Sequence, residues 1–310
     1  MQQNVVWPEG KRFAFTVFDD TDLATRENVG PVYAFLEELG FRTTKSVWPI
    51  AGRNEPVLGG ATCEDDGYRT WLLRLQAAGF EIGLHNATYH TSPRGETIRG
   101  IERFEQIFGH PPRSLANHAG NSEGIYWGDA RVTGINAGIY NVLTRFRRRR
   151  RFRGHHPSEP LFWGDVCLEN VKYVRNFVFA EINTLAACPY MPYHDPRRPY
   201  VRYWFASTEG ATAHSFADSI REENQDRLEE EGGACIMYAH FAKDFFKHGR
   251  LHDQFKTRME RLARKNGWFV PVSTLLDYIL QQRGPLEVTG RQRAGLERKW
   301  LLHKALVGPS

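Results

Sequence analysis

Short apolar runs alternate with amphipathic stretches along most of the 310-residue chain. The first run, FAFTVFDD at Phe13–Asp20, is apolar at successive positions, which is typical of a strand buried on both faces. Runs of strand type return at Phe41–Ile50, Phe80–Leu84, Ser114–Asn117, Phe177–Ile182, Ala234–Ala239 and Trp268–Val272. Helical patterns lie at Arg26–Gly40, Tyr68–Ala78, Thr97–Phe108, Ser215–Glu231 and Leu251–Lys265. Strands that alternate with helices in this way predict parallel βαβ units, and therefore an α/β fold.

Two segments in the middle of the chain are less regular. Gly120–Asn141 is rich in glycine and asparagine, and Asn183–Ser207 is rich in proline and aromatic residues. We expect long ordered loops over the mouth of a barrel here, with no separate domain. Residues 1–284 then form one domain, and residues 285–310 are a basic C-terminal tail whose short amphipathic piece, Ala294–Leu306, packs on the body or on a partner.

Composition narrows the class of protein. Hydrophobic residues make up 41% of the chain and aromatic residues 13%, which excludes an intrinsically disordered protein. Four cysteines lie far apart without C-x-x-C spacing, so we expect buried thiols, and neither a zinc ribbon nor a disulfide framework. No segment has the pattern of a secretion signal or the length of a membrane span, and the expected location is the cytoplasm.

Chemically competent side chains follow several of the expected strands. In folds built from parallel βαβ units, active sites form at the carboxyl ends of the strands. The groups at these positions are Asp19 and Asp20, His85, Asn117 and His118, and His240. Their agreement at four strand ends predicts an active site.

The two aspartates suggest a division of roles. Neighbouring residues on a strand point to opposite sides, so Asp19 and Asp20 do not form a facing dyad, and one can bind a cation while the other acts as a base. His85 and His90 with Asp20 offer two nitrogens and one oxygen, a donor set that suits zinc. The alternatives are that the aspartates cap the loop Thr21–Thr25 and that the histidines lie on the surface.

The ordered motifs TVFDD, EIGLHNATYH, IMYAH and GWFVPVSTLLDYIL resemble the polysaccharide deacetylase family, also called the NodB-homology or carbohydrate esterase 4-like family. The resemblance spans roughly Arg12 to Gln282 and implies a distorted (β/α) barrel of seven parallel strands. It also implies that Asp20, His85 and His90 hold a divalent metal ion, for which we expect zinc. By the same resemblance, Asp19 is the catalytic base and His240 the general acid.

The chain departs from the family pattern at three places. The two histidines are five residues apart, where the family has four. LANHAGN stands where the family has an arginine near the base, so Asn117 or His118 takes the place of that arginine as the partner of Asp19. Both residues are expected to bind substrate, and His118 is an alternative third ligand of the metal. In YVRYWF, Tyr203 and Trp204 either form the wall of a sugar pocket or pack in the core.

The resemblance implies a metal-dependent deacetylase that hydrolyses an N-acyl group, the acetyl group above all, of an amino sugar or a glycan precursor. A polymer substrate agrees poorly with a cytoplasmic location, which favours a sugar precursor or a lipid-linked sugar. Two alternatives stay open: a hydrolase of the same fold acting on an O-acyl ester or a non-sugar amide, and a non-catalytic glycan-binding protein with a degenerate metal site.

The run RFRRRRRFR at Arg145–Arg153 carries much of the formal net charge of +5. It is either a site for an anionic ligand or a solvated surface. No nucleic-acid-binding motif accompanies it, so we do not expect nucleic acid as a partner. Assembly of this chain into a homo-oligomer stays an open alternative.

Overall fold

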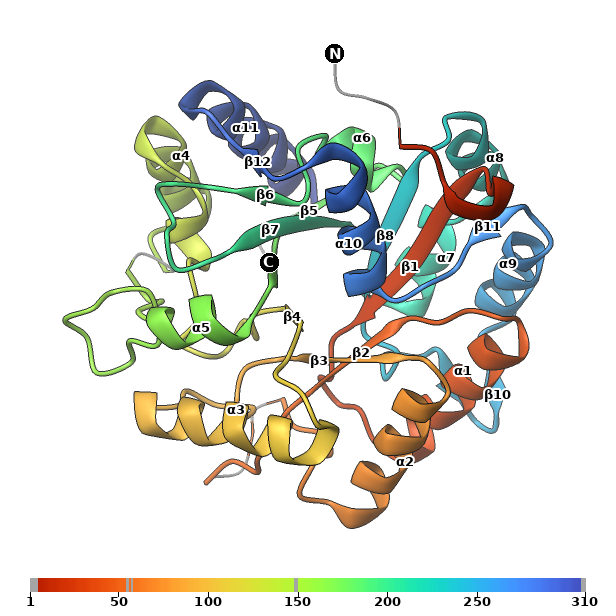
Figure 1. Ribbon diagram of the computed structural model, residues 1–310, viewed down its shortest axis with the longest axis horizontal. Helices are drawn as coiled ribbons and strands as arrows, with labels where there is room; N and C mark the ends of the chain where they lie inside the picture. Colours follow the sequence, from red (N-terminus) through yellow and green to blue (C-terminus); the bar gives the residue numbers. More distant parts are fainter. Residues whose placement is uncertain (1–4, 54–55, 57, 148–149, 308–310) are drawn as a thin grey trace.

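The computed structural model describes residues 5–53, 56, 58–147 and 150–307 and has a closed barrel of parallel strands at its centre (Figure 1). Each strand pairs in parallel with the next, and β8 returns to pair with both β7 and β1, which closes the ring. The seven strands are β1 (Phe13–Asp19), β2 (Thr44–Val47), β3 (Glu81–Leu84), β4 (Ser114–Leu115), β5 (Tyr173–Phe179), β7 (Tyr203–Thr208) and β8 (Ala234–Ala239). The expected distorted barrel of seven parallel strands is confirmed.

Helices surround the barrel on its outer face, as Figure 1 shows. They are α1 (Arg26–Glu38), α2 (Asp66–Ala77), α3 (Arg94–Phe108), α4 (Gly134–Leu143), α5 (Gly164–Asn170), α6 (Thr184–Ala187), α7 (Ala213–Ser219), α8 (Glu222–Glu230), α9 (Asp253–Ala263), α10 (Val272–Arg283) and α11 (Gly290–Val307). Short 3-10 helices lie at η1 (Pro8–Gly10) and η2 (Gly128–Arg131). The remaining strands are β6 (Tyr193–His194), β9 (Phe246–Lys247), β10 (Arg250–Leu251), β11 (Gly267–Trp268) and β12 (Leu286–Glu287).

Strand β1 lies between β2 and β8, and all seven of its residues are buried. Its side chains alternate between two environments. Phe15 packs edge-on against Phe41, and Phe18, on the other side of the strand, packs against Phe205 of β7. Both faces are therefore apolar, which explains the unbroken hydrophobic run in the sequence.

Several expected elements differ from the structure. The strand expected at Phe177–Ile182 begins earlier, and Asn183–Ser207, expected to be loop, ends in the barrel strand β7. The single charged helix expected at Ser215–Glu231 is two helices, separated at Ile220 and Arg221. The strand expected at Trp268–Val272 ends at Trp268, because the segment that follows leads into α10.

The C-terminal segment is part of the folded body. Strand β12 pairs in parallel with β6, and α11 packs against α4 and β5. Trp300 of α11 is fully buried, and its ring stacks on Tyr140 of α4 at a centroid distance of 5.5 Å. This attachment brings the last turns of α11 to the mouth of the barrel, where Lys304 is 4% exposed.

Within the described residues, no helix has the length and hydropathy of a membrane span. The four cysteines are buried and free, as expected.

Candidate metal and hydrolytic site

Asp19 and Asp20 point to opposite sides of β1. The carboxylate of Asp19 faces α1, where its Oδ2 lies 2.9 Å from Nζ of Lys45 and accepts a hydrogen bond from the Tyr33 hydroxyl. Its Oδ1 accepts from the backbone N–H of Phe241 at 2.8 Å. Lys45 is the residue that pairs with Asp19 across β1 and β2, so this buried ion pair follows from the strand register. Burial raises the pKa of Asp19, against the opposing charge of Lys45.

Asp20 faces the barrel interior and pairs with Arg175 of β5. Two parallel hydrogen bonds join them, at 2.9 Å to Oδ1 and 2.6 Å to Oδ2, and both side chains are buried. The guanidinium also lies over the Tyr238 ring, at 4.4 Å from its centroid. Burial opposes ionisation of Asp20, but the charge and hydrogen bonds of Arg175, together with the nearby imidazoles of His85 and His240, outweigh it and lower the pKa of this carboxyl group.

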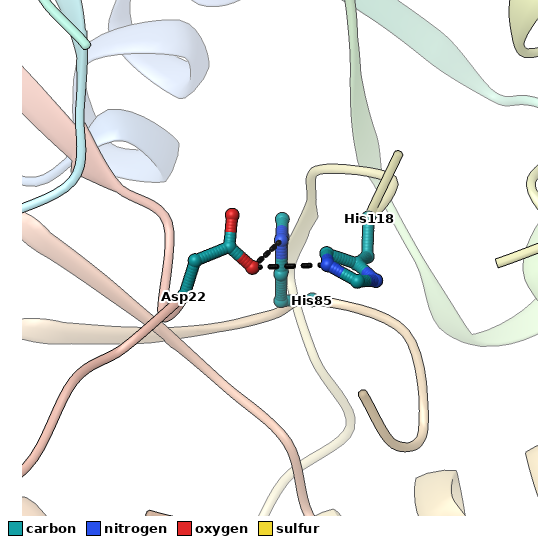
Figure 2. Close-up of side chains that lie close together, drawn as sticks. All are labelled: Asp22, His85 and His118. Atoms are coloured by element: carbon teal, nitrogen blue, oxygen red, sulfur yellow. Dashed lines mark ion pairs between the residues drawn. The ribbon is translucent and has the colours of Figure 1, made fainter. Parts of the chain in front are cut away.

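Three buried side chains, Asp22, His85 and His118, converge at the ends of β1, β3 and β4. Figure 2 shows both imidazole rings directed at one oxygen of Asp22. Asp22 Oδ1 lies 3.1 Å from His118 Nε2 and 3.7 Å from His85 Nε2. Their candidate ligand atoms all lie within 4.8 Å of one another.

The donor atoms of this cluster fit a divalent metal ion. Two ligands that are each about 2 Å from a tetrahedral ion lie roughly 3.3 Å apart, close to the separations found here. Asp22 Oδ1 and both ring nitrogens of His85 are buried and have no hydrogen-bond partner in the described part of the chain. Burial lowers the pKa of His85, which favours the neutral ring that metals bind. The neighbouring imidazoles hold the pKa of Asp22 well below its usual value, although burial opposes this.

Asn121 orients His118. Its side-chain oxygen lies 2.9 Å from His118 Nδ1, and its amide donates to Thr88 O and to Glu123 Oε1, which fixes which end of the amide faces the ring. Because an amide oxygen only accepts, Nδ1 of His118 carries a proton and Nε2 is left with a lone pair directed at Asp22. A carboxylate oxygen and a ring lone pair at 3.1 Å need a cation between them or a second proton on the ring.

His240 completes the cluster from the end of β8. Its Nε2 lies 2.8 Å from Asp22 Oδ2, and its Nδ1 lies 3.2 Å from the carbonyl oxygen of Ala211. Both partners are acceptors, so each ring nitrogen can donate a hydrogen bond to one of them. His240 is therefore placed to give up a proton beside the candidate metal ligands.

Two cavities meet at Asp22. The inner cavity, of about 60 Å³, also contacts Asp20, His85, Asn117 and His240. The outer cleft, of about 550 Å³, also contacts His118, Tyr89 and His90. Asp19 lines neither of these cavities, because it faces the helices.

The other predicted site residues lie as follows. His90 is outside the Asp22–His85–His118 cluster, and its Nε2 accepts a hydrogen bond from the backbone N–H of Arg53 at 2.6 Å. Asn117 holds the loop after β4 through two hydrogen bonds to the backbone of Ile125. Tyr203 and Trp204 lie on β7 and line neither cavity, and Trp204 is buried in the core.

The metal-ligand set expected from the resemblance, Asp20 with His85 and His90, is thus not what the fold brings together. Both carboxylate oxygens of Asp20 are bonded to Arg175, and the extra residue between the two histidines leaves His90 on the wall of the outer cleft. Asp22 is the residue that sequence reasoning missed. The sequence feature that could have identified Asp22 is the string DDTD, in which it is the third aspartate, in a loop directly after the strand.

Arg175 was also missed, because it lies within a strand that has no recognisable motif. The arginine run Arg145–Arg153 reaches the site through Arg151, which lines the outer cleft and donates to the Gly120 carbonyl. Arg153 forms an ion pair with Glu159. Arg148 and Arg149 lie outside the described residues, and an anionic ligand of the run stays a prediction.

No family model and no curated protein matches this sequence. Solved structures do match its fold. A protein of Mycobacterium smegmatis assigned as a polysaccharide deacetylase aligns with a TM-score of 0.50 at 13% identity, over 93% of this chain and 98% of that one. A protein of Pseudomonas aeruginosa PAO1 with the same assignment aligns with a TM-score of 0.50 at 11% identity, over 89% and 93%.

The PuuE allantoinase aligns equally well, with a TM-score of 0.50 at 11% identity, over 89% of this chain and 92% of the other. Identities this low establish a shared fold and leave the chemistry to be argued from the site. The structural matches agree with the resemblance seen in the sequence motifs. The chain has the fold of the polysaccharide deacetylases.

Proposed function

We propose that this protein is a metal-dependent amidohydrolase that removes an acyl group from nitrogen. The observation that carries the proposal is the buried cluster of Asp22, His85 and His118 at the carboxyl ends of three barrel strands. Asp22 Oδ1 and both ring nitrogens of His85 have no hydrogen-bond partner in the described part of the chain. Zinc is the first metal to test, because one carboxylate and two imidazoles are a common donor set for it. When bound, such an ion polarises the acyl carbonyl and lowers the pKa of a water molecule.

The residues around the cluster support hydrolysis. We assign the base to Asp20 and not to Asp19, because Asp20 lines the inner cavity and is kept ionised by Arg175. Asp20 accepts a proton from the attacking water, whose oxygen forms a bond to the acyl carbon. His240 donates a proton to the nitrogen as the carbon–nitrogen bond breaks. One water is consumed, and a carboxylic acid and an amine are released.

The fold and the sequence motifs suggest which panel of compounds to test as substrates. Polysaccharide deacetylases and an allantoinase share this fold, so an N-acetylated amino sugar and a small cyclic amide both belong in it. The N-acetylated amino sugar, as a stand-in for a glycan precursor, is the first compound to test. Detection of the released amine separates amide hydrolysis from ester hydrolysis, which releases an alcohol.

The test of the metal site is elemental analysis after loading with zinc. Wild type should hold about one ion per chain, and His118→Ala should lose it together with turnover, because one of three protein ligands is gone. His90→Ala is the matched control, since it removes an imidazole from the outer cleft and should keep the ion. Wild type without stoichiometric metal, or His118→Ala with full metal content, would refute the proposed site.

A further inference from the structure

Helix α4 presents an apolar stripe to the outside of the molecule. Of the eleven large hydrophobic side chains that are exposed in the described part of the chain, four lie on α4 and a fifth, Phe146, comes three residues after its end. The four are Ile135, Ile139, Val142 and Leu143, and this spacing places them along one face of a helix. Ile135 is 85% exposed and Val142 65%. Exposed apolar side chains that gather in one place are typical of an interaction surface.

The opposite face of α4 is attached to the body largely through polar groups. The Asn136 amide donates to the buried carboxylate of Glu297 on α11 at 2.8 Å, and the Thr133 hydroxyl, just before the helix, donates to the same group. Tyr140 is the large ring on this face and stacks on Trp300. The usual arrangement of a surface helix, apolar inward and polar outward, is therefore partly reversed in α4. The apolar stripe contributes little to the folding of a single chain.

Exposed arginines adjoin the apolar stripe. Arg145 and Arg147 flank Phe146, and neither has an acidic partner among the residues that the structure describes. Arg150 and Arg151 follow and are also exposed. Apolar side chains next to unpaired positive charges form a surface that suits anionic lipids, because the apolar groups enter the boundary of the acyl chains while the cations bind the headgroup phosphates.

We propose that α4 and the arginines that follow it dock on an anionic membrane surface. A nucleic acid would pair with the arginines but would leave the apolar stripe in water. A second copy of the chain would cover the stripe, but a symmetric contact through this face would bring two arginine segments together, which like charges oppose. The inference concerns a surface outside the candidate metal site and does not depend on the proposed function.

Docking in this way holds the outer cleft near the lipid. Arg151 lines that cleft and is five residues from Phe146 in the chain. Five residues span at most about 18 Å, even when the chain is fully extended. A substrate that is anchored in the membrane therefore lies within reach of the cleft.

Vesicle sedimentation tests the proposal. The vesicles are of phosphatidylcholine alone, or of phosphatidylcholine partly replaced by anionic phosphatidylglycerol, and we expect wild type to bind the anionic vesicles about tenfold or more tightly than the neutral ones. Ile135→Ser/Val142→Ser should weaken binding to the anionic vesicles by about tenfold or more, because two apolar side chains no longer leave water. Arg145→Gln/Arg147→Gln should weaken it by a similar factor, because two charges no longer meet the headgroups.

Two control variants change residues away from α4. Val6→Ser/Leu73→Ser removes two exposed apolar side chains, and Arg26→Gln/Arg74→Gln removes two exposed arginines at α1 and α2, which lie across the barrel from α4 in Figure 1. Both controls should bind the anionic vesicles like wild type. The arginine control has the same net charge as Arg145→Gln/Arg147→Gln, so a difference between them reports the place of the charges and not their number.

Three outcomes would overturn the proposal. The first is equal binding to neutral and anionic vesicles, or no binding to either. The second is an equal loss in the α4 variants and their controls, which would reflect the general charge and hydrophobicity of the chain. The third is a wild-type dimer in sedimentation velocity without lipid that Ile135→Ser/Val142→Ser abolishes, because a second copy would then cover the stripe. Thermal denaturation checks each variant, and Phe146→Ser, which lies beyond the helix, repeats the apolar test without a change in α4.

Discussion

Replacement of Arg175 by methionine tests the electrostatic argument for the barrel interior. Methionine keeps much of the side-chain volume but removes the charge and both hydrogen bonds to Asp20, of 2.9 and 2.6 Å. Asp20 is 3% exposed, and His85 Nδ1, at 3.9 Å from its Oδ1, is too distant for a hydrogen bond. Removal of one partner from a buried ion pair destabilises a protein by about 3–5 kcal/mol, and we expect a loss in this range for Arg175→Met.

The loss should depend on pH with a definite sign. In wild type the pKa of Asp20 lies below its ordinary value of 3.8, so the stability that it contributes is present above this pH and is lost as pH falls through the folded-state pKa. In metal-free Arg175→Met the buried carboxyl has lost its main cationic partner, and its pKa should rise above the unfolded value because burial is the largest influence on it. The variant then loses stability as pH rises above about 4, by up to about 1.4 kcal/mol per pH unit until the raised pKa is passed.

Urea unfolding between pH 4 and pH 8 measures both effects. The double variant Asp20→Asn/Arg175→Met removes both charges, and it should recover at least half of the loss, because no uncompensated charge remains. A loss below about 1 kcal/mol, a loss that is independent of pH, or a double variant no more stable than Arg175→Met would refute the reasoning.

Three further predictions concern the surroundings of the site. Asn121→Ala should weaken zinc binding about 10–100-fold in a competition titration, because His118 loses its orienting partner, while Asn28→Ala, which alters only the start of α1, should bind like wild type. Trp300→Ala should lower the free energy of unfolding by about 3–5 kcal/mol and be visible as a lower Tm, since the ring is fully buried; an unchanged Tm would contradict its role in holding α11. Burial raises the pKa of Glu123 to about 7, so between pH 4.5 and 7 the unfolded state binds fewer protons and stability falls as pH rises. Glu123→Gln should remove a fall on the order of 3 kcal/mol from the stability profile, and identical profiles would show that this carboxyl does not titrate with folding.

The sequence predicted the barrel because its signals are local. The apolar run of β1, the helical spacing of α1 and the glycines that end helices are all readable over a dozen residues. Strand β7 is not predicted from the sequence, because its residues Tyr203–Thr208 follow a proline- and aromatic-rich stretch that is typical of loops. The sequence pattern predicts one helix in place of α7 and α8, because the break at Ile220 has no glycine or proline to signal it.

The site was predictable in position but not in detail. The strand ends at Asp20, His85 and His240 were found from the sequence, because the fold class brings carboxyl ends together. The exact partners depend on strand register and side-chain direction. Because side chains alternate along β1, Asp19 points toward Lys45. The pairing of Asp20 with Arg175 joins residues that are 155 positions apart. No pattern in a single sequence contains such a contact.

The closure of the barrel between β1 and β8 makes the site a late product of folding. The hydrogen bond from the Phe241 backbone to Asp19 spans 222 positions, and His240 reaches Asp22 across nearly the same distance. Contacts of such high sequence separation form slowly, because a long loop must be ordered before they provide any stabilisation. During synthesis, a chain that ends before β8 has Asp22, His85 and His118 but lacks the strand that closes the ring around them. The ability to retain zinc should therefore appear late in refolding, together with the last strand, and its time course would report the moment at which the barrel closes.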